Sequence, residues 1–450
     1  MSARLSTVYS CSNCDAQYPR WVGRCSQCGK FGTISTEGTV IQKATVKSAS
    51  SVPVADTVNL GSLKSVNVPK FSSGYGEIDR VIGGGIAQSG VTLVTGEPGV
   101  GKSTLLLALA GRLGKKVLYV SGEESAEQVS GRLQRLDISG DQISFTTASE
   151  VGSLVQVINH QLPQLVVVDS LQTMASGQAE GSAGSPNQVR AVLAGLIEAA
   201  KSTKAAIFVI GHVTKEGVAA GPKSIEHLVD VVLQLEGNSN QSLRFLRASK
   251  NRFGPTDEVG VFQMEEHGLV EVSNPSALFL AERHQGAGSC ITAVLEGTRS
   301  LLIELQALVA HSRLAYPKRA TAGFDVNRLG MLLAVLGERA GVKLNYSDVY
   351  INLAGGFRSR EPALDLAVIA SVASATLKKP LPHDLIVFGE VGLGGEVRPV
   401  VGAEKRLNET SRLGFKQVLM PNLSTKTKLP TGLELIPVRT VAEAVDWLRY

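Results

Sequence analysis

Nine residues decide how the middle of this chain folds: Gly96-Glu97-Pro98-Gly99-Val100-Gly101-Lys102-Ser103-Thr104. The pattern Gly-x4-Gly-Lys-Ser is the Walker A motif. An apolar run, Val91–Thr95, precedes it and a helical apolar pattern, Thr104–Arg112, follows it. The glycines let backbone N–H groups turn toward phosphate oxygens, and the N-terminus of the next helix adds its positive end. The stretch therefore predicts a strand, a loop and a helix that together bind ATP through all nine residues.

The chemistry expected at this loop needs a cation, a hydroxyl and a carboxylate. Lys102 is expected to reach the β- and γ-phosphates, and Ser103 to offer its hydroxyl to Mg²⁺. Asp169 ends the apolar run Leu165–Asp169, which fits a Walker B strand that holds Mg²⁺ through its water shell. A chance glycine turn and a strand that merely ends in Asp are the plain alternatives, and both weaken when the two patterns occur together.

ATP hydrolysis also needs a carboxylate that orients the attacking water. Glu123 and Glu124 follow another apolar run, Lys116–Val120, at the kind of strand end where ligands of doubly wound sheets gather. Either glutamate can fill the role, and the sequence does not separate them. A solvated acidic turn is the alternative.

Short β-branched runs alternate with helical stretches from about residue 58 to 270. Continuous apolar runs suit buried parallel strands, and the lengths between them suit crossover helices. We therefore expect a doubly wound α/β core with a mostly parallel sheet, followed by a hairpin-like stretch over Leu243–Val272. The expected core strands are Val91–Thr95, Lys116–Val120, Leu165–Asp169, Ala206–Ile210 and Val229–Gln234.

Four of the five cysteines crowd near the N-terminus. Cys11 and Cys14 form one CxxC unit, and Cys25 and Cys28 form a second one ten residues further on. Four thiolates at this spacing can close a tetrahedral shell, for which Zn²⁺ is the preferred occupant. Two disulfides or a redox CxxC are the alternatives, but they suit a secreted chain or a single motif. A structural Cys₄ zinc finger over residues 1–35 is predicted.

Length and composition set broad limits. The 450 residues allow about two or three domains at ~100–200 residues each, and 43% hydrophobic and 19% charged residues are ordinary for a globular protein. No apolar run of ~18 residues and no secretory leader is found, so we expect a cytoplasmic protein without a membrane span. Residues 1–50 carry +4 of the net charge of +5, so bulk charge permits nucleic-acid binding without indicating it.

Composition also divides the rest of the chain. Residues 36–57 are small and polar without a sustained period, which is typical of a linker. The α/β core is assigned to residues 58–272, and residues 273–450 form a further α/β unit. Its expected elements are a strand over Gly288–Leu295 and helices over Val326–Arg339 and Pro362–Leu377.

Taken together, these features resemble the bacterial RadA (Sms) DNA-repair family over essentially the whole chain. The resemblance rests on the doubled CxxC, on Gly83-Gly-Gly85 ahead of the Walker A loop in a RecA-like core, on Lys250-Asn-Arg-Phe-Gly254, and on a C-terminal domain similar to the Lon protease domain. It implies a hexameric, DNA-dependent ATPase and helicase that moves on single-stranded DNA. It also implies cooperation with the RecA recombinase in branch migration during recombinational repair.

The Lys250–Gly254 motif is consistent with that reading on its own chemistry. Lys250 and Arg252 follow the last core strands and can reach the γ-phosphate held by a neighbouring subunit, as an arginine finger does. Contacts to DNA phosphates are equally open. A solvated basic hairpin is the plain alternative.

Two loops after core strands are candidate DNA contacts. Met174–Pro186 is a Gly/Ser-rich loop expected to be flexible, and the next loop offers Lys215 and Lys223 to phosphates. Ordinary surface loops fit these sequences about as well. His212, just before the second loop, is either a γ-phosphate sensor or a structural histidine.

The Lon-like domain raises ATP-dependent proteolysis as a rival function. That chemistry needs a serine nucleophile and a lysine base. The family's serine position falls on Ala363 and its lysine position on Glu404, with Lys405 adjacent, so we reject proteolysis. The domain is then a scaffold, and its basic residues either contact DNA or simply keep it soluble; they are Arg313, Lys318, Arg319, Lys378 and Lys379.

A second rival is a RecA-like or circadian-clock-like ATPase that signals through protein contacts. The paired Glu123 and Glu124 fit such an enzyme as well as a DNA motor. Stimulation of ATP turnover by single-stranded DNA separates the two.

Overall fold

The computed structural model describes residues 9–14, 16–18, 20–35, 68–211, 225–237, 242–281, 283–314, 316–423 and 430–449. The chain divides into two compact units, Met1–Val66 and Asn67–Tyr450. The linker predicted over residues 36–57 lies outside the described residues.

The first unit is a small antiparallel sheet with the strand order β2-β1-β3. Each CxxC turn is closed by backbone hydrogen bonds: the Cys11 N–H donates to Ala16 O and the Cys25 N–H to Lys30 O, both at 3.0 Å. Gly29 follows the second turn with a φ of 71°, a conformation that glycine adopts without strain. The strands are β1 (Tyr9–Cys11), β2 (Gln17–Tyr18) and β3 (Ile34–Ser35).

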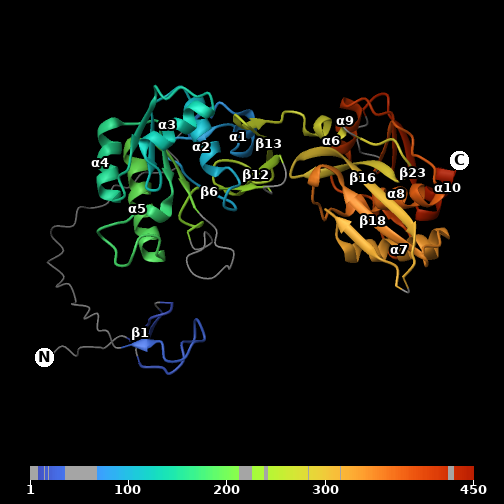
Figure 1. Ribbon diagram of the computed structural model, residues 1–450, viewed down its shortest axis with the longest axis horizontal. Helices are drawn as coiled ribbons and strands as arrows, with labels where there is room; N and C mark the ends of the chain where they lie inside the picture. Colours follow the sequence, from blue (N-terminus) through green and yellow to red (C-terminus); the bar gives the residue numbers. More distant parts are fainter. Residues whose placement is uncertain are drawn as a thin grey trace, which may run out of the picture. The chain divides into compact units, whose positions relative to one another are not determined.

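A nine-stranded sheet organises the first part of the second unit (Figure 1). Its order is β14-β13-β12-β11-β6-β10-β9-β7-β8; neighbours from β11 to β8 run parallel, and β12 to β14 add an antiparallel meander. This confirms the predicted mostly parallel core. The strands are β6 (Val91–Thr95), β7 (Val117–Ser121), β8 (Ile143–Thr146), β9 (Leu165–Asp169), β10 (Ala206–Ile210), β11 (Val231–Glu236), β12 (Leu243–Asn251), β13 (Val259–Glu265) and β14 (Gly268–Glu271).

Helices cover both faces of this sheet because alternate residues of each strand point to opposite sides. Val94 packs with α1, α2 and α3 on one face, whereas Leu93 packs with α4 and α5 on the other. The paired short strands β4 (Lys70–Phe71) and β5 (Ile86–Ala87) precede β6. The helices are α1 (Gly76–Val81), α2 (Lys102–Arg112), α3 (Ala126–Arg135), α4 (Val151–Gln161) and α5 (Pro186–Thr203).

A seven-stranded mixed sheet, in the order β17-β18-β16-β15-β19-β22-β23, organises the C-terminal part. Residues of α7, α8 and α10 share one hydrophobic core with it, and Leu407 of α9 belongs to a second core. The strands are β15 (Ser289–Glu296), β16 (Arg299–His311), β17 (Arg319–Ala322), β18 (Ser347–Leu353), β19 (Leu385–Val387), β22 (Gln417–Pro421) and β23 (Glu434–Val438), with a separate hairpin of β20 (Glu390–Val391) and β21 (Val397–Arg398). The helices are α6 (Pro275–Leu280), α7 (Val326–Ala340), α8 (Asp365–Leu377), α9 (Ala403–Arg412) and α10 (Val441–Arg449).

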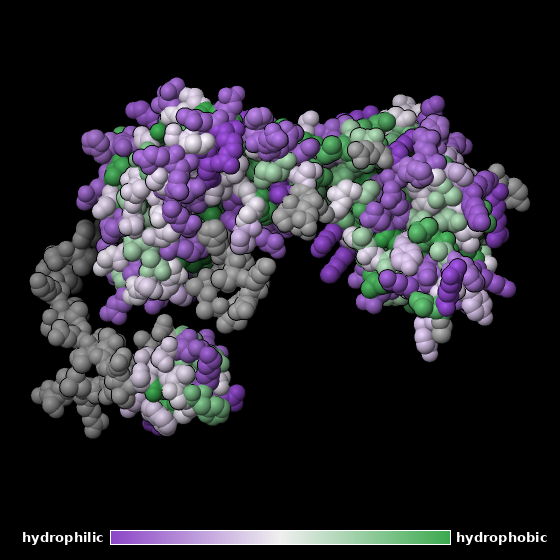
Figure 2. All heavy atoms as spheres, viewed as in Figure 1, coloured by the Kyte–Doolittle hydropathy of each residue, from purple (hydrophilic) through white to green (hydrophobic). Residues whose placement is uncertain are grey.

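No helix within the described parts of the chain is both long and apolar enough to cross a bilayer. In the view of Figure 2, hydrophilic side chains cover most of the surface over α3 and α4, and hydrophobic ones are scattered among them. Scattered apolar residues of this kind are normal on protein surfaces.

Candidate nucleotide and metal sites

The Walker A loop connects β6 to α2, as the sequence predicts. Two of its glycines are required by their surroundings. A Cβ on Gly96 would lie 2.4 Å from Leu235 O, and one on Gly101 would lie 2.7 Å from Met264 Cε. Gly101 also caps α2 with a φ of 111°, which favours glycine. The remaining loop positions Glu97, Pro98 and Gly99 are exposed, Val100 is buried, and Ser103 and Thr104 are partly buried in the first turn of α2.

Lys102 holds a buried cation inside this loop. Its side chain is only 4% exposed, and Nζ donates hydrogen bonds to Gly96 O and Glu97 O, both at 3.0 Å. Burial lowers the pKa of Lys102, while the charge of Asp169 acts in the opposite direction. Within the described residues no carboxylate forms an ion pair with Lys102, so an anionic ligand is needed to neutralise its charge locally.

The structure places Asp169 at the end of β9, buried among polar partners. Tyr119 donates its hydroxyl proton to Asp169 Oδ2 at 2.8 Å. Burial, with the nearby Asp169 charge, raises the pKa of Tyr119, so the tyrosine remains a hydrogen-bond donor. Tyr119 could not be singled out from the sequence, because it lies in an apolar run that is typical of a buried strand.

The two candidate glutamates have different partners. Glu123 Oε1 accepts a hydrogen bond from Ser170 Oγ at 2.8 Å, which brings this carboxylate to the residue after Asp169. Glu124 instead forms an ion pair with Arg132 of α3. Glu123 therefore lies beside the end of the Walker B strand β9, whereas Glu124 is held in an ion pair with α3. Two identical neighbouring residues could not be distinguished in this way from the sequence.

Arg244 of β12 is a further residue at the loop that the sequence did not reveal. It is 4% exposed, and its Nε donates to Val100 O at 2.9 Å. Burial lowers its pKa. Arg244 therefore ties the antiparallel part of the sheet to the backbone of the Walker A loop.

Lys250 and Arg252 lie near the end of the sheet at which β6 begins, whereas the Walker A loop follows the other end of β6. Because β11 runs parallel to β6 with Val231 beside Thr92, the start of β11 marks the edge where β6 begins. Lys250 Nζ donates to the carbonyls of Glu226, His227 and Val229 at 2.8 to 3.2 Å, just before β11. A five-residue strand separates the two edges by about 16 Å at ~3.3 Å per residue. The structure does not bring this motif to the loop of its own chain.

At the same end of the sheet, the Gly83–Gly85 segment lies against the Lys250–Gly254 motif. A Cβ on Gly83 would lie 3.0 Å from Gly254 Cα, so these two segments of the chain leave little room for a side chain between them. Lys70 Nζ donates to Gly83 O at 2.6 Å and to Phe253 O at 2.8 Å, joining both segments. Arg252 forms a 3.1 Å ion pair with Asp230 and remains 57% exposed.

Of the two loops expected to contact DNA, the structure describes only the first. His212, Lys215 and Lys223 lie outside the described residues. The first loop is less free than its composition suggests, because the buried Gln188 side chain accepts from Ser176 N and donates to Ser176 O and Ala179 O. This amide anchor from α5 could not be read from glycine and serine content.

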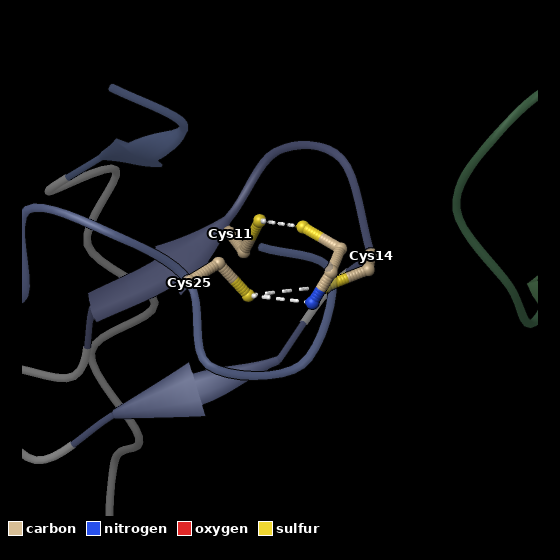
Figure 3. Close-up of side chains that lie close together, drawn as sticks. Cys11, Cys14 and Cys25 are labelled. Atoms are coloured by element: carbon tan, nitrogen blue, oxygen red, sulfur yellow. Dashed lines mark hydrogen bonds between the residues drawn. The ribbon is translucent and has the colours of Figure 1, made fainter. Parts of the chain in front are cut away.

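The four N-terminal cysteines converge on one point (Figure 3). Their Sγ atoms all lie within 4.8 Å of one another, with 3.7 Å between Cys11 and Cys28 and 3.5 Å between Cys14 and Cys25. A tetrahedral ion with metal–sulfur bonds of about 2.3 Å needs sulfur atoms about 3.8 Å apart. All four cysteines are free of disulfides. The donor set and spacing thus fit a tetrahedral metal ion.

Tyr18 adds a partner to this cluster that the sequence did not suggest. Its hydroxyl lies 3.1 Å from Cys25 Sγ, and this hydrogen bond is the main cause that lowers the pKa of Cys25 to about 6. A thiolate is the form that binds metal. Tyr18 therefore favours the ligating state of Cys25.

The Lon-like domain holds no serine–lysine pair at the positions expected from the sequence. Ala363 is 1% exposed and packs in a hydrophobic cluster, so its side chain faces the core. Glu404 and Lys405 are exposed, whereas Arg406 of the same helix is buried and forms an ion pair with Glu361.

Three family models match parts of this chain. A rubredoxin metal binding domain matches residues 9–36, an AAA domain matches residues 62–218, and subunit ChlI of Mg-chelatase matches residues 332–424. The order of these matches follows the three folded regions described above.

Curated relatives match over nearly the full length. Proteins named DNA repair protein RadA from Pseudomonas aeruginosa and Escherichia coli are 44% and 40% identical to it, over 99% of this chain and 99% of their own. The protein of that name from Bacillus subtilis is 42% identical over 98% of both chains. Among solved structures, the RadB recombinase covers 45% of this chain and 99% of its own at 25% identity and a TM-score of 0.36.

Proposed function

Since this chain belongs to the RadA family, we propose that it is a DNA-dependent ATPase and helicase that acts on single-stranded DNA. It promotes branch migration with the RecA recombinase in recombinational repair, as a cytoplasmic homo-oligomeric ring of six subunits. The full-length match to proteins named DNA repair protein RadA supports the repair role. The placement of the Lys250 motif across the sheet from the Walker A loop supports the ring.

The residues of the Walker A loop and the neighbouring strand ends divide the work of ATP hydrolysis. Gly96–Thr104 cradles the phosphates, and Lys102 neutralises the β- and γ-phosphates. Ser103 and Asp169 hold Mg²⁺, which when bound offsets the charge on the phosphate oxygens. Glu123 orients the attacking water, because its carboxylate already lies one hydrogen bond from Ser170.

Lys250 and Arg252 complete the site of the neighbouring subunit. They lie about one strand length from their own loop, so their cations serve a γ-phosphate only if a second subunit presents it. Arg252 is the better finger because it is exposed, whereas Lys250 fixes the backbone of residues 226–229 beneath it. DNA phosphates are a further partner for both, together with Lys215 and Lys223.

The four cysteines hold one structural Zn²⁺. Their spacing suits its tetrahedral shell, and the ion stabilises a unit too small to bury a large core. We assign residues 1–35 to this zinc finger, 36–57 to a linker, 58–272 to the ATPase domain and 273–450 to the Lon-like domain. The nine-stranded and seven-stranded sheets fall on either side of the last boundary.

The shared site is tested by mixing two inactive variants. Lys102→Ala removes the phosphate cation, and Arg252→Ala removes the finger, so each alone is expected to lose single-stranded-DNA-stimulated ATP turnover. In a mixed ring, an Arg252→Ala subunit keeps an intact loop and meets an intact Arg252 on its Lys102→Ala neighbour. Turnover of the mixture should therefore exceed the sum of the separate variants.

Three outcomes are decisive. Recovery on mixing supports a site built from two subunits, and no recovery contradicts it. A wild-type turnover that single-stranded DNA leaves unchanged contradicts the motor and favours a signalling ATPase. Lys343→Ala, at an exposed position of the Lon-like domain, controls for the loss of a positive charge elsewhere.

A further inference from the structure

A cationic cavity of about 410 Å³ lies where α1 and the start of β16 meet α9. Four basic side chains line it: Arg80 of α1, Arg299 of β16, and Lys405 and Arg412 of α9. None of them belongs to the Walker A loop, to the Lys250 motif or to the cysteine cluster. The cavity is thus a separate feature of the second unit.

The positive charge in this cavity is only partly neutralised. Arg299 and Arg80 share one carboxylate, Glu77, at 2.9 and 3.4 Å. Arg412 pairs with Glu409 at 2.8 Å. The Lys405 side chain has no ion pair or hydrogen bond to any described residue. Four cations against two carboxylates leave a net charge of +2 on the walls.

Glu258 is a further carboxylate close to this wall. It accepts a hydrogen bond from the Thr298 hydroxyl, and Thr298 itself lines the cavity. Counting Glu258 with the four cations, Glu77 and Glu409, these groups carry a net charge of +1. An anion is the ligand that such a wall recognises.

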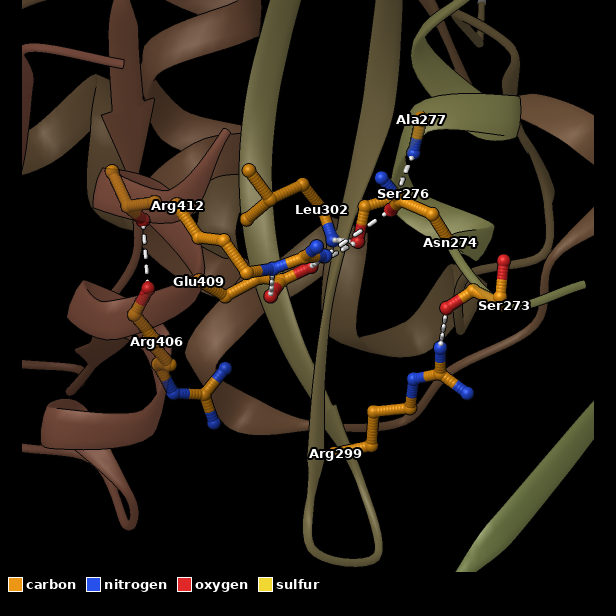
Figure 4. A network of polar contacts seen from close by, with 10 residues as sticks. Ser273, Asn274, Ser276, Ala277, Arg299, Leu302, Arg406, Glu409 and Arg412 are labelled. Carbon is orange, nitrogen blue, oxygen red and sulfur yellow. Dashed lines mark hydrogen bonds and ion pairs between the residues drawn. The ribbon is translucent and has the colours of Figure 1, made fainter. Parts of the chain in front are cut away.

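Two of the four cations, Arg299 and Arg412, are held in place by contacts with neighbouring polar groups (Figure 4). Arg299 donates to Ser273 O at 2.6 Å, and Arg412 donates to both oxygens of Glu409 at 2.8 Å and to Asn274 Oδ1 at 3.2 Å. Lys405 and Arg412 lie seven residues apart on α9, a spacing that puts them on one face of a helix. Preorganised donors of this kind lower the entropic cost of binding.

Ser300 provides an independent sign of a missing partner. It lines the cavity, is 6% exposed, and its Oγ has no hydrogen-bond partner in the described structure. Buried hydroxyls are nearly always hydrogen-bonded, and an unmade bond is costly. Because this oxygen is closed off from solvent, a ligand oxygen beside Arg299 would reach it only after the cavity wall shifts.

We propose that this cavity is a phosphoryl-binding site, in which Arg80, Arg299, Lys405 and Arg412 surround the oxygens of one phosphate group. Arginine side chains match the geometry of phosphate oxygens, and Lys405 adds a point charge that no protein group satisfies. The volume exceeds that of a single phosphate ion, so the group enters attached to a larger molecule. Its two possible sources are a small phosphate compound and the backbone of a nucleic acid.

The experiment measures binding of inorganic phosphate to the full-length protein by titration calorimetry. The Walker A loop is first saturated with Mg²⁺ and a non-hydrolysable ATP analogue, so that its own phosphate pockets are filled. The double variant Lys405→Gln/Arg412→Gln removes the two cations of α9 and keeps the Arg299–Glu77 pair. Lys343→Gln removes one positive charge from an exposed position away from the cavity and serves as the control.

We expect one phosphate per chain beyond the loop, bound at least about tenfold more weakly by the double variant and unchanged in the control. Phosphate binding that is absent in the wild type, or equal in the double variant, overturns the site. The result is independent of the motor function, since no turnover is measured.

A second arm identifies the source of the phosphate. Affinity for an oligothymidylate is measured at several salt concentrations in the same proteins. If the backbone of a nucleic acid is the source, the double variant loses about two from the salt slope, about one for each cation. An unchanged slope together with lost phosphate binding assigns the site to a small phosphate compound.

Discussion

Lys102 and Arg406 are both buried cations, yet only one of them is suited to bind a ligand. Lys102 is 4% exposed and donates to two carbonyls of the Walker A loop, with no ion-paired carboxylate in the described structure. Arg406 is fully buried and forms an ion pair with Glu361, with further hydrogen bonds to Ala293 O and Val401 O. The chain itself supplies the counter-charge of Arg406 and leaves that of Lys102 to a phosphate.

The difference follows from the cost of burying charge. A buried cation must be paired, and the partner can be internal or can arrive with a ligand. An internal partner makes the cation a structural element, since removing either group leaves the other as an unpaired buried charge. An external partner makes it a binding group whose removal affects the ligand more than the fold.

The largest effect is expected for Arg406→Ala. Glu361 would keep its charge in a partly buried position without its ion-pair partner, which costs about 3–5 kcal/mol of unfolding free energy. The loss of unfolding free energy is measured by chemical denaturation, followed by a spectroscopic signal from the C-terminal domain. The double variant Arg406→Met/Glu361→Gln should recover most of the loss, because it removes both charges and retains volume. A single variant as stable as the wild type contradicts the internal pairing.

Lys102→Ala should have the opposite profile. Transition-state stabilisation by one such group is typically worth about 10²–10³ in kcat, so ATP turnover should fall by at least that factor. Stability should change by less than about 1 kcal/mol, because a cation without an ion pair is removed. Turnover and denaturation are measured on the same preparation. Lys115→Ala, which removes an exposed lysine after α2, should leave both unchanged.

The two glutamates sharpen the distinction within the ATPase domain. Glu123→Gln keeps the shape and removes the charge beside Ser170, so turnover should fall by about 10²-fold with nucleotide affinity retained. Glu124→Gln breaks the pair with Arg132 and should cost less turnover and more stability. Single-turnover kinetics separates hydrolysis from binding. A larger hydrolysis defect in Glu124→Gln would reverse the proposed roles.

Much of this arrangement could be predicted from the sequence because it is encoded locally. Val91–Thr95 and Leu165–Asp169 coincide with strands β6 and β9, since a short apolar run rich in β-branched residues favours a buried strand. The predicted helix over Pro362–Leu377 is divided in the structure, because Pro362–Leu364 form a 3₁₀ turn and α8 begins at Asp365.

The pairings that decide roles were not accessible in the same way. Glu123 and Glu124 differ only through Ser170 and Arg132, which lie in other elements. Glu404, Lys405 and Arg406 form a charged run in which nothing local marks Arg406 as the buried member. Partner choice depends on tertiary contacts, and a single sequence does not record them.

The smallest effect is expected at the position where a protease of this fold carries its nucleophile. Ala363→Ser would place a hydroxyl in a hydrophobic cluster, with a cost of about 1–2 kcal/mol if it finds no partner. It should not create casein cleavage, because the position expected for the lysine base holds Glu404 and the adjacent Lys405 is exposed on α9. Ala277→Ser, at an exposed position of α6, should be neutral within about 0.5 kcal/mol. Cleavage by Ala363→Ser would mean that another group, such as Lys405, serves as the base.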